Sequence, residues 1–234
     1  YILHSVDLLL PVSERYSQII QEKYPFCKGK TAYLHNGVEK INLEHGGVQR
    51  EKGRIIAVGG DRKLKNNITV ARAMAKLGTD RVLTVYGHLY NPKNLPQGKN
   101  IEFKGLVPQT QLYEEMRKSE LYILNSVYES FALSVYDALL CGCSVLVTNV
   151  AGALELLNVT EHDVIFDPMD ENEIANKIDY LLENPNNTRL LSSLDFNKIS
   201  YKAEVEKLEN YCNQLCRPSR QADGENRPHP GRGY

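Results

Sequence analysis

The chain is predicted to be an α/β protein, with a Rossmann-like, mainly parallel sheet that carries helices on both faces. About six short apolar runs alternate with segments of helical period along the sequence, which is typical of such sheets. Residues 121–147 give the clearest unit, because two buried-strand candidates flank a helical segment that stops at Gly142. Strand, helix and strand in this order form a right-handed βαβ unit. Candidate binding residues also follow directly after several of the predicted strands.

The composition indicates an ordinary globular protein. The chain has 234 residues, a formal net charge of −1 and 42% hydrophobic residues, which suits one large domain or two. The balanced charge argues against a nucleic-acid partner, which usually requires a basic face. We find no internal repeat and no membrane-spanning run. The first residue is Tyr1 rather than Met, so we interpret the sequence as an excised piece, whose missing signal segment proves little.

The cysteines predict thiols rather than disulfides or a metal site. Their number is odd, which does not favour a disulfide framework. Cys141 and Cys143 flank a turn into a predicted core strand, so burial is expected there instead of zinc binding. This usage fits a reducing cytoplasm.

The first segment, residues 1–38, is predicted to contain two short strands around one helix. The strands are expected at 8–10 and 31–35, and the helix runs from its cap at Ser13 to about Tyr24. His35, at the end of the second strand, is expected to be structural. Residues 39–53 are polar and charged and are predicted to be a linker or loop.

The next strand leads into a glycine-rich, basic loop. An apolar run from Arg54 enters Gly59 and Gly60, and a basic cluster and a helix to about Leu77 follow. Glycines let a ligand approach the backbone, and cations attract its negative charge. The loop matches neither the dinucleotide fingerprint nor a P-loop. An anion site is therefore one interpretation, and a solvated basic loop is the other.

The remaining elements continue the alternation of strands and helices. Strands are expected at 82–86, 101–107, 121–124, 144–147 and 163–166, and helices at 109–118, 131–141, 171–184, 187–194 and 201 to about 215. Glu155 follows the predicted strand at 144–147 and is expected to cap its own helix. Residues 218–234 lack periodicity and are predicted to be a disordered tail or a cloning-derived end.

Two acids stand at the helix of the central unit. Glu129 lies in the loop before it, and Asp137 lies eight residues later, about 12 Å along a helix. This spacing suits a long ligand rather than a single metal ion. Amides at 130–132 would be free donors for phosphate at the helix N-terminus. Alternatively, Asp137 is a solvated helix residue and Glu129 complements the helix dipole.

The same stretch resembles a known family. Residues 129–133 (ESFAL), the second acid and residues 141–146 (CGCSVL) are similar to the E-x7-E signature of retaining glycosyltransferases of the GT-B fold, nearest to glycosyltransferase family 4. The sequence differs from that pattern in having Asp137 for the second Glu, Ala132 for the second Gly and Ser144 for Pro. The runs PVSE and HNGVE in the first segment resemble the family's hinge region.

The resemblance implies a domain organisation. Residues 1–38 would be the end of an N-terminal acceptor domain and its hinge, and 39–200 the domain that binds the nucleotide sugar. Residues 201–217 would form the helix that crosses back, and 218–234 the tail. Most of the acceptor domain would then lie outside this chain, which would bind the donor without transferring the sugar.

The resemblance also implies roles for individual residues. The cations would stabilise the departing diphosphate, Glu129 would bind the sugar and Asp137 the ribose, and the base would lie on the 106–107 backbone. The implied catalytic residues are Glu129, Arg62 and Lys65, with Lys63 as a competitor for the Arg role. The implied donor-binding residues are Gly60, Gly87, Leu106, Val107, Ser130, Phe131, Ala132, Leu133 and Asp137.

No metal and no other cofactor is expected, and the expected partner is a nucleotide sugar. The full enzyme is expected in the cytoplasm, where peripheral association with a membrane is compatible with the resemblance. Two other functions stay open at this point. One is a sugar-nucleotide epimerase of the same architecture, and the other is a nucleotide-sugar-binding module that has lost its chemistry.

Overall fold

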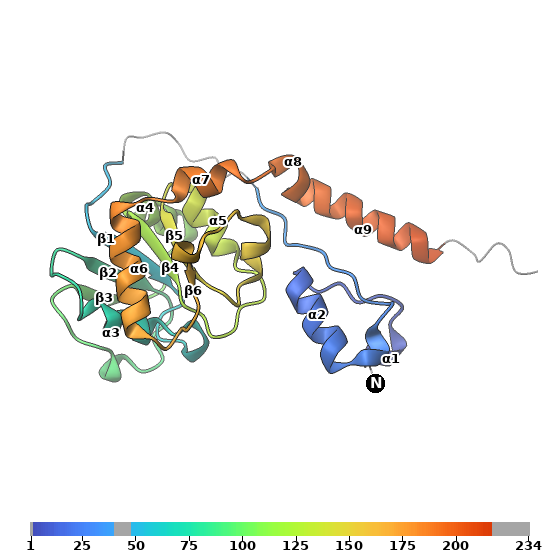
Figure 1. Ribbon diagram of the computed structural model, residues 1–234, viewed down its shortest axis with the longest axis horizontal. Helices are drawn as coiled ribbons and strands as arrows, with labels where there is room; N and C mark the ends of the chain where they lie inside the picture. Colours follow the sequence, from blue (N-terminus) through green and yellow to red (C-terminus); the bar gives the residue numbers. More distant parts are fainter. Residues whose placement is uncertain (1, 40–47, 217–234) are drawn as a thin grey trace, which may run out of the picture.

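A six-stranded sheet lies at the centre of the computed structural model, which describes residues 2–39 and 48–216 (Figure 1). All strand pairs are parallel, in the order β3-β2-β1-β4-β5-β6. The strands are β1 (Arg54–Val58), β2 (Val82–Tyr86), β3 (Ile101–Lys104), β4 (Leu121–Leu124), β5 (Ser144–Thr148) and β6 (Val164–Ile165). Strands β2 and β3 are added on one side of β1, and strands β4, β5 and β6 on the other. The order in which strands are added therefore reverses between β1 and β4. The predicted parallel α/β fold is confirmed.

Helices cover both faces of the sheet, as predicted. One hydrophobic cluster joins α3 (Asn67–Met74) and α6 (Glu171–Glu183) to one face. The second cluster joins α4 (Gln109–Lys118), α5 (Leu133–Leu140) and α7 (Asn187–Ser192) to the other face. The remaining α-helices are α1 (Ile2–Ser5), α2 (Glu14–Lys23), α8 (Phe196–Ile199) and α9 (Tyr201–Cys216). The 3₁₀ helices are η1 (Pro25–Cys27), η2 (Lys63–Lys65), η3 (Pro92–Asn94), η4 (Gly152–Leu156) and η5 (Glu161–Asp163).

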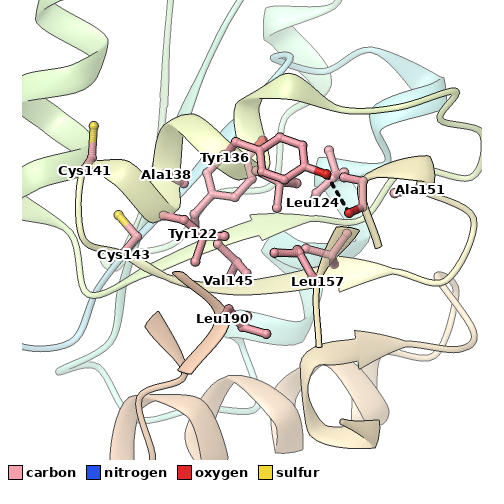
Figure 2. Close-up of a cluster of buried hydrophobic side chains, with 14 of the residues drawn as sticks. Tyr122, Leu124, Tyr136, Ala138, Cys141, Cys143, Val145, Ala151, Leu157 and Leu190 are labelled. Atoms are coloured by element: carbon pink, nitrogen blue, oxygen red, sulfur yellow. Dashed lines mark hydrogen bonds between the residues drawn. The ribbon is translucent and has the colours of Figure 1, made fainter. Parts of the chain in front are cut away.

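Helix α5 is fixed to the sheet by its apolar face, as Figure 2 shows. Val135, Tyr136, Ala138 and Leu139 are all buried, at the spacing that one face of a helix requires. The Tyr136 hydroxyl reaches across the cluster and donates a 2.7 Å hydrogen bond to the carbonyl of Ala153. The helix that carries Asp137 is therefore packed firmly between the sheet and the loop after β5.

The turn after α5 confirms the prediction of buried thiols. The helix stops before Gly142, whose φ of 88° is a conformation that favours glycine. Cys141 and Cys143 are both buried and free, and the Cys143 thiol donates to the carbonyl of Met116 at 2.9 Å. Burial raises the pKa of both thiols to about 12, so they are protonated and unreactive at neutral pH.

The first segment differs in part from the prediction. Helix α2 begins after Ser13, whose hydroxyl accepts the amide of Tyr16 at 3.2 Å, as expected for an N-cap. The predicted strands 8–10 and 31–35 are reduced to a single parallel bridge between Leu9 and Thr31. Within the described residues neither stretch pairs with a strand of the sheet, and two isolated strands are marginal in water.

The C-terminal helices also differ from the prediction. The helix expected at 187–194 ends at Ser192, and a separate helix, α8, follows with Asp195 as its N-cap. Helix α9 projects beside the sheet on the same side as α2 (Figure 1). Its first amide, that of Tyr201, donates to the Glu39 carboxylate at 2.9 Å. Residues 40–47 of the predicted linker at 39–53, and the predicted tail at 218–234, lie outside the described residues.

Candidate functional site

The loops after β1 and β4 meet at one ion pair. The Lys65 ammonium lies against the Glu129 carboxylate, with the two side chains 24% and 13% exposed. The backbones of the two loops are also joined, because the Val127 amide donates to the carbonyl of Leu64 at 3.0 Å. Two residues that are 64 positions apart in the sequence are thus neighbours, as the expected convergence at one sheet edge requires.

This ion pair joins the loops after β1 and β4, where the order in which strands are added to the sheet reverses. Strands β1 and β4 are parallel neighbours, but α3 follows β1 on one face and α5 follows β4 on the other. The two loops therefore diverge at the carboxyl ends of β1 and β4, the place where open α/β sheets have their ligand-binding crevice, and we call this place the crevice. The crevice carries one ammonium and one carboxylate, which can bind a phosphate and sugar hydroxyls respectively.

Glycines in the crevice make room for protein atoms. A Cβ on Gly59 would overlap the aliphatic chain of Lys65, so this glycine lets the lysine cross the loop towards Glu129. Gly60 and Gly87, with φ of 61° and 139°, pack backbone against backbone, and a Cβ on either would overlap the other loop. These contacts explain both glycines without a ligand, and the prediction that they bind the donor stays a prediction.

Asp61 fixes the same two loops to each other. Its carboxylate, which is 7% exposed, accepts the amides of Tyr90 and Asn91 at 2.7 and 2.6 Å. The edge of the crevice formed by β1 and β2 is therefore rigid, because carboxylate–amide bonds of this kind are among the stronger hydrogen bonds in proteins.

The stretch 130–132 presents backbone amides to the crevice. The helix begins at Leu133 rather than at the predicted Phe131, with Ala132 as N-cap. No partner for the amides of Ser130, Phe131 and Ala132 is found among the described residues. The side chain of Phe131 is buried in the core cluster, so only its backbone is available to a ligand. Among these three amides, that of the N-cap Ala132 belongs to the helix N-terminus, which favours an anion.

Ala132 has a left-handed backbone, with φ 78° and ψ 71°, which costs a non-glycine residue about 1–2 kcal/mol. Ala132→Gly is expected to stabilise the protein by about 0.5–1 kcal/mol, because the relieved strain exceeds the extra chain entropy lost by glycine. A urea titration of both proteins measures this change. Ala138→Gly, within α5, is the matched control and is expected to destabilise by about 1 kcal/mol or more. A loss of stability in both variants would contradict the expected strain at Ala132.

Asp137 lies in a hollow of its own, deeper along α5. The hollow has a volume of about 270 Å³ and is bounded by the hinge, by the first turn of α9 and by α4. Leu133, Tyr113 and Gln109 line it together with the acid. Burial raises the pKa of Asp137 to about 6, and the Tyr113 hydroxyl partly offsets the rise. Asp137 is therefore not a solvated helix residue, which was the alternative interpretation.

The raised pKa of Asp137 predicts a pH-dependent stability. The Asp137 carboxyl binds its proton more tightly in the folded protein than in the unfolded chain. The acid therefore costs no stability below pH 3.8, where it is protonated in both states, and its full destabilising effect is reached above about pH 6. After allowance for partial exposure, Asp137→Asn is expected to gain about 1–2 kcal/mol relative to the native protein between these pH values. Urea titrations at pH 4 and pH 7 measure this difference, and the exposed Asp7→Asn is the control. Equal differences at both pH values would contradict it.

Among the described residues, Arg62 does not take part in the Lys65–Glu129 ion pair. It lines a different hollow, of about 260 Å³, together with Lys63, Arg72 and Met169. The structure therefore joins Lys65 to Glu129 but gives Arg62 other surroundings, beside α3. Leu106 is 74% exposed, and Val107 is partly buried against the core cluster. The predicted roles of these three residues are not tested by these contacts.

Sequence reasoning missed one contact near the crevice. Glu155 was expected to cap its own helix, but its carboxylate accepts the amides of Glu14 and Arg15 at 2.9 and 2.8 Å, at the start of α2. His35 lies 3.1 Å from the same carboxylate. A bond between residues more than 100 positions apart leaves no local pattern, so the acid could be noticed only as a polar residue after a strand.

Metal and membrane sites were also sought in the structure. Among residues 2–39 and 48–216, no three His, Cys, Asp or Glu side chains are arranged to hold a metal ion. The metal-free chemistry expected from the sequence stays a prediction. In the same part of the chain, no helix combines the length and apolar character needed to span a bilayer.

Comparisons with known proteins identify the family of the chain. The model of the family described as glycosyl transferases group 1 matches residues 39–195. The N-acetylgalactosamine-N,N'-diacetylbacillosaminyl-diphospho-undecaprenol 4-alpha-N-acetylgalactosaminyltransferase of Campylobacter jejuni is 28% identical over 187 residues, or 76% of this chain and 51% of that protein. The mannosylfructose-phosphate synthase of Agrobacterium fabrum is 24% identical over 170 residues, or 70% of this chain and 35% of that protein. The chain thus spans about a third to a half of these curated relatives.

Solved structures share the fold. HepE of Anabaena, in complex with UDP and glucose, superposes with a TM-score of 0.70 and 16% identity, over 90% of this chain and 64% of HepE. A TarM variant of S. aureus, in a complex that includes UDP, gives a TM-score of 0.74 and 16% identity, over 90% of this chain and 45% of TarM. At this identity the likeness is one of fold.

Proposed function

The chain belongs to the group 1 glycosyl transferases, and we propose that it is the donor-binding part of an enzyme that transfers a sugar from a nucleoside diphosphate to an acceptor. The observation that carries this proposal is the Lys65–Glu129 pair in the crevice between β1 and β4. The cation and the free amides that precede α5 suit the diphosphate of a nucleotide sugar, and the carboxylate suits the hydroxyl groups of its sugar.

In this proposal the donor extends along the crevice and α5. The diphosphate lies between Lys65 and the amides of 130–132, and the sugar lies on Glu129. The ribose points towards Asp137, whose carboxylate accepts hydroxyl groups as acids do in dinucleotide sites. The base lies on the backbone at 106–107. Gly60, Gly87 and Leu133 border this path.

The reaction breaks the bond between the anomeric carbon and the phosphate oxygen, and a bond to the oxygen of an acceptor hydroxyl replaces it with retained configuration, while the hydroxyl proton passes to the departing diphosphate. Negative charge grows on the leaving diphosphate, where Lys65 and the amides stabilise it more in the transition state than in the ground state. Glu129 favours the positive charge that develops at the sugar ring. Arg62 adds a second positive charge beside the path, and the chemistry proceeds without a metal.

The acceptor and the compartment are proposed from the family and the relatives. The acceptor binds to a domain that precedes the hinge, so residues 1–38 end that domain and this chain alone binds the donor without transferring its sugar. The enzyme acts in the cytoplasm, and peripheral membrane association suits a lipid-linked acceptor such as the one named for the Campylobacter relative.

Isothermal titration of this chain with UDP, GDP and ADP tests donor binding. One nucleotide is expected to bind, with UDP as the first probe because HepE was solved with it, and Lys65→Ala is expected to weaken the binding. Lack of binding by all three would overturn the proposal. Mixing the full-length protein with donor alone separates the open alternatives, since an epimerase would yield a new sugar isomer by NMR. A full-length protein that binds the donor without turnover would indicate a module that has lost its chemistry.

A further inference from the structure

One carboxylate joins the first segment of the chain to the donor crevice. Glu155, in η4, accepts the first two amides of α2, at 2.9 Å from Glu14 and 2.8 Å from Arg15. A carboxylate at a helix N-terminus compensates both the unpaired amides and the helix dipole. Helix α2 is thus capped in part by a residue that is about 140 positions away.

The same carboxylate also contacts a buried histidine. The Nε2 atom of His35 lies 3.1 Å from Glu155, and the two side chains are 7% and 22% exposed. On its other side the His35 ring stacks on Phe131, with centroids 5.4 Å apart and planes 29° apart. His35 is therefore packed between Glu155 and the stretch that carries the free amides.

A backbone bond closes this set of contacts. The carbonyl of Phe131 accepts the amide of Ala153 at 2.7 Å, two residues before Glu155. Glu155, His35 and Phe131 therefore form a closed ring of contacts, which we call the 35–131–155 ring. A change at any member of the ring alters the support of the others.

Helix α2 contacts the neighbouring loops as well. The Arg15 guanidinium donates to the carbonyl of Asn149 at 2.6 Å, in the loop after β5. The Tyr16 ring lies edge-on to Tyr128, with centroids 6.1 Å apart, in the loop after β4. The start of α2 thus contacts the loop after β4, which carries the amides of 130–132, and also the loop after β5.

We propose that Glu155 and His35 are positioning residues, which orient the amides of 130–132 for the donor phosphate and couple donor binding to the docking of α2. This inference rests on the proposed function. Neither residue touches the donor in our proposal, because both act through Phe131. Coupling between two sites is reciprocal, so a bound nucleotide is also expected to hold α2 more firmly against the crevice.

Hydrogen exchange and UDP titration of three variants test the inference. Glu155→Ala removes the cap and the histidine contact, and His35→Phe keeps a ring against Phe131 but cannot bond Glu155. Glu161→Gln is the control, since this acid is 79% exposed and pairs only with the surface residue His162. All measurements are made well below the melting temperature of each variant, so that the proteins are equally folded.

Glu155→Ala is expected to accelerate exchange about tenfold at the amides of 14–15 and at those of Val135 and Ala153, which donate to the carbonyls of Ala132 and Phe131, and to weaken UDP binding about tenfold. His35→Phe is expected to give an intermediate loss, and Glu161→Gln none. UDP is expected to slow exchange in α2 of the native chain but not of Glu155→Ala. A purely structural cap would accelerate exchange at 14–15 alone and leave the amides of Val135 and Ala153 and the UDP affinity unchanged, and that result would overturn the inference.

The test separates this inference from the proposed function. If the native chain binds no nucleotide, the proposed function fails, but exchange at Val135 and Ala153 in the ligand-free variants still reports whether Glu155 orients residues 130–132. Unchanged exchange at both amides in Glu155→Ala overturns the positioning role whether or not UDP binds.

Discussion

Replacing Lys65 with alanine is expected to lower sugar transfer by the complete enzyme about 10²–10³-fold, the effect of removing one group that stabilises a developing anion. Lys65 is the cation that faces Glu129 in the crevice, so its ammonium lies where the leaving diphosphate would gain charge. The loss is expected in kcat at saturating donor, because the contact strengthens as the phosphate departs. Turnover of the full-length protein with radiolabelled donor measures it.

Lys63→Ala is the matched control for that experiment. Lys63 belongs to the same 3₁₀ turn, but it is exposed and lines the hollow beside α3. Its removal is expected to change kcat less than about threefold, since exposed charges contribute little. Near-normal turnover by Lys65→Ala, or equal losses in both variants, would remove Lys65 from its proposed role.

The sheet and its helices could be predicted because their signals are local. The buried strands β4 and β5 are short apolar runs, and the alternation of such runs with helical periods fixes the fold class. Polar residues after strand ends must then converge, since parallel strands end at one edge. The approach of Lys65 to Glu129 follows from this rule.

The ends of elements were harder to predict because tertiary contacts decide them. Phe131 continues the helical period of α5, but it is apolar because it packs against His35 and the core. The helix begins two residues later, after the left-handed Ala132. In the same way, the apolar run at 31–35 reads as a strand, yet its pairing is limited to one bridge within the described residues.

The detail of the crevice required distances that spacing does not supply. Seven residues lie between Glu129 and Asp137, which predicts that both serve one extended ligand. The structure adds that Asp137 lies in a separate hollow with Tyr113, while Arg62 lines another. Glu155 was seen as a cap, but its partner helix lies at the opposite end of the sequence. Contacts of this kind depend on the packing of whole elements.

Glu129→Gln is expected to separate donor binding from turnover. The substitution keeps the shape of the side chain and an oxygen that can accept the Ser126 hydroxyl, which lies 3.4 Å from Glu129, but it removes the charge that neutralises Lys65. The phosphate then no longer competes with a carboxylate for the ammonium, so UDP is expected to bind equally well or about twofold to fivefold more tightly. Transfer is expected to fall about 100-fold or more, because the positive charge at the sugar ring loses its partner.

Titration of the chain with UDP and turnover of the full-length variant measure the two effects of Glu129→Gln. Glu102→Gln, which removes an exposed strand residue paired with Lys104, is the control and is expected to change neither. The double variant with Lys65→Ala adds a stricter test. When two residues act together on one transition state, the double variant loses less transition-state stabilisation than the sum of the losses in the two single variants. Strict additivity, or a loss of UDP affinity that accounts for the whole loss of turnover, would show that Glu129 binds the ground state only.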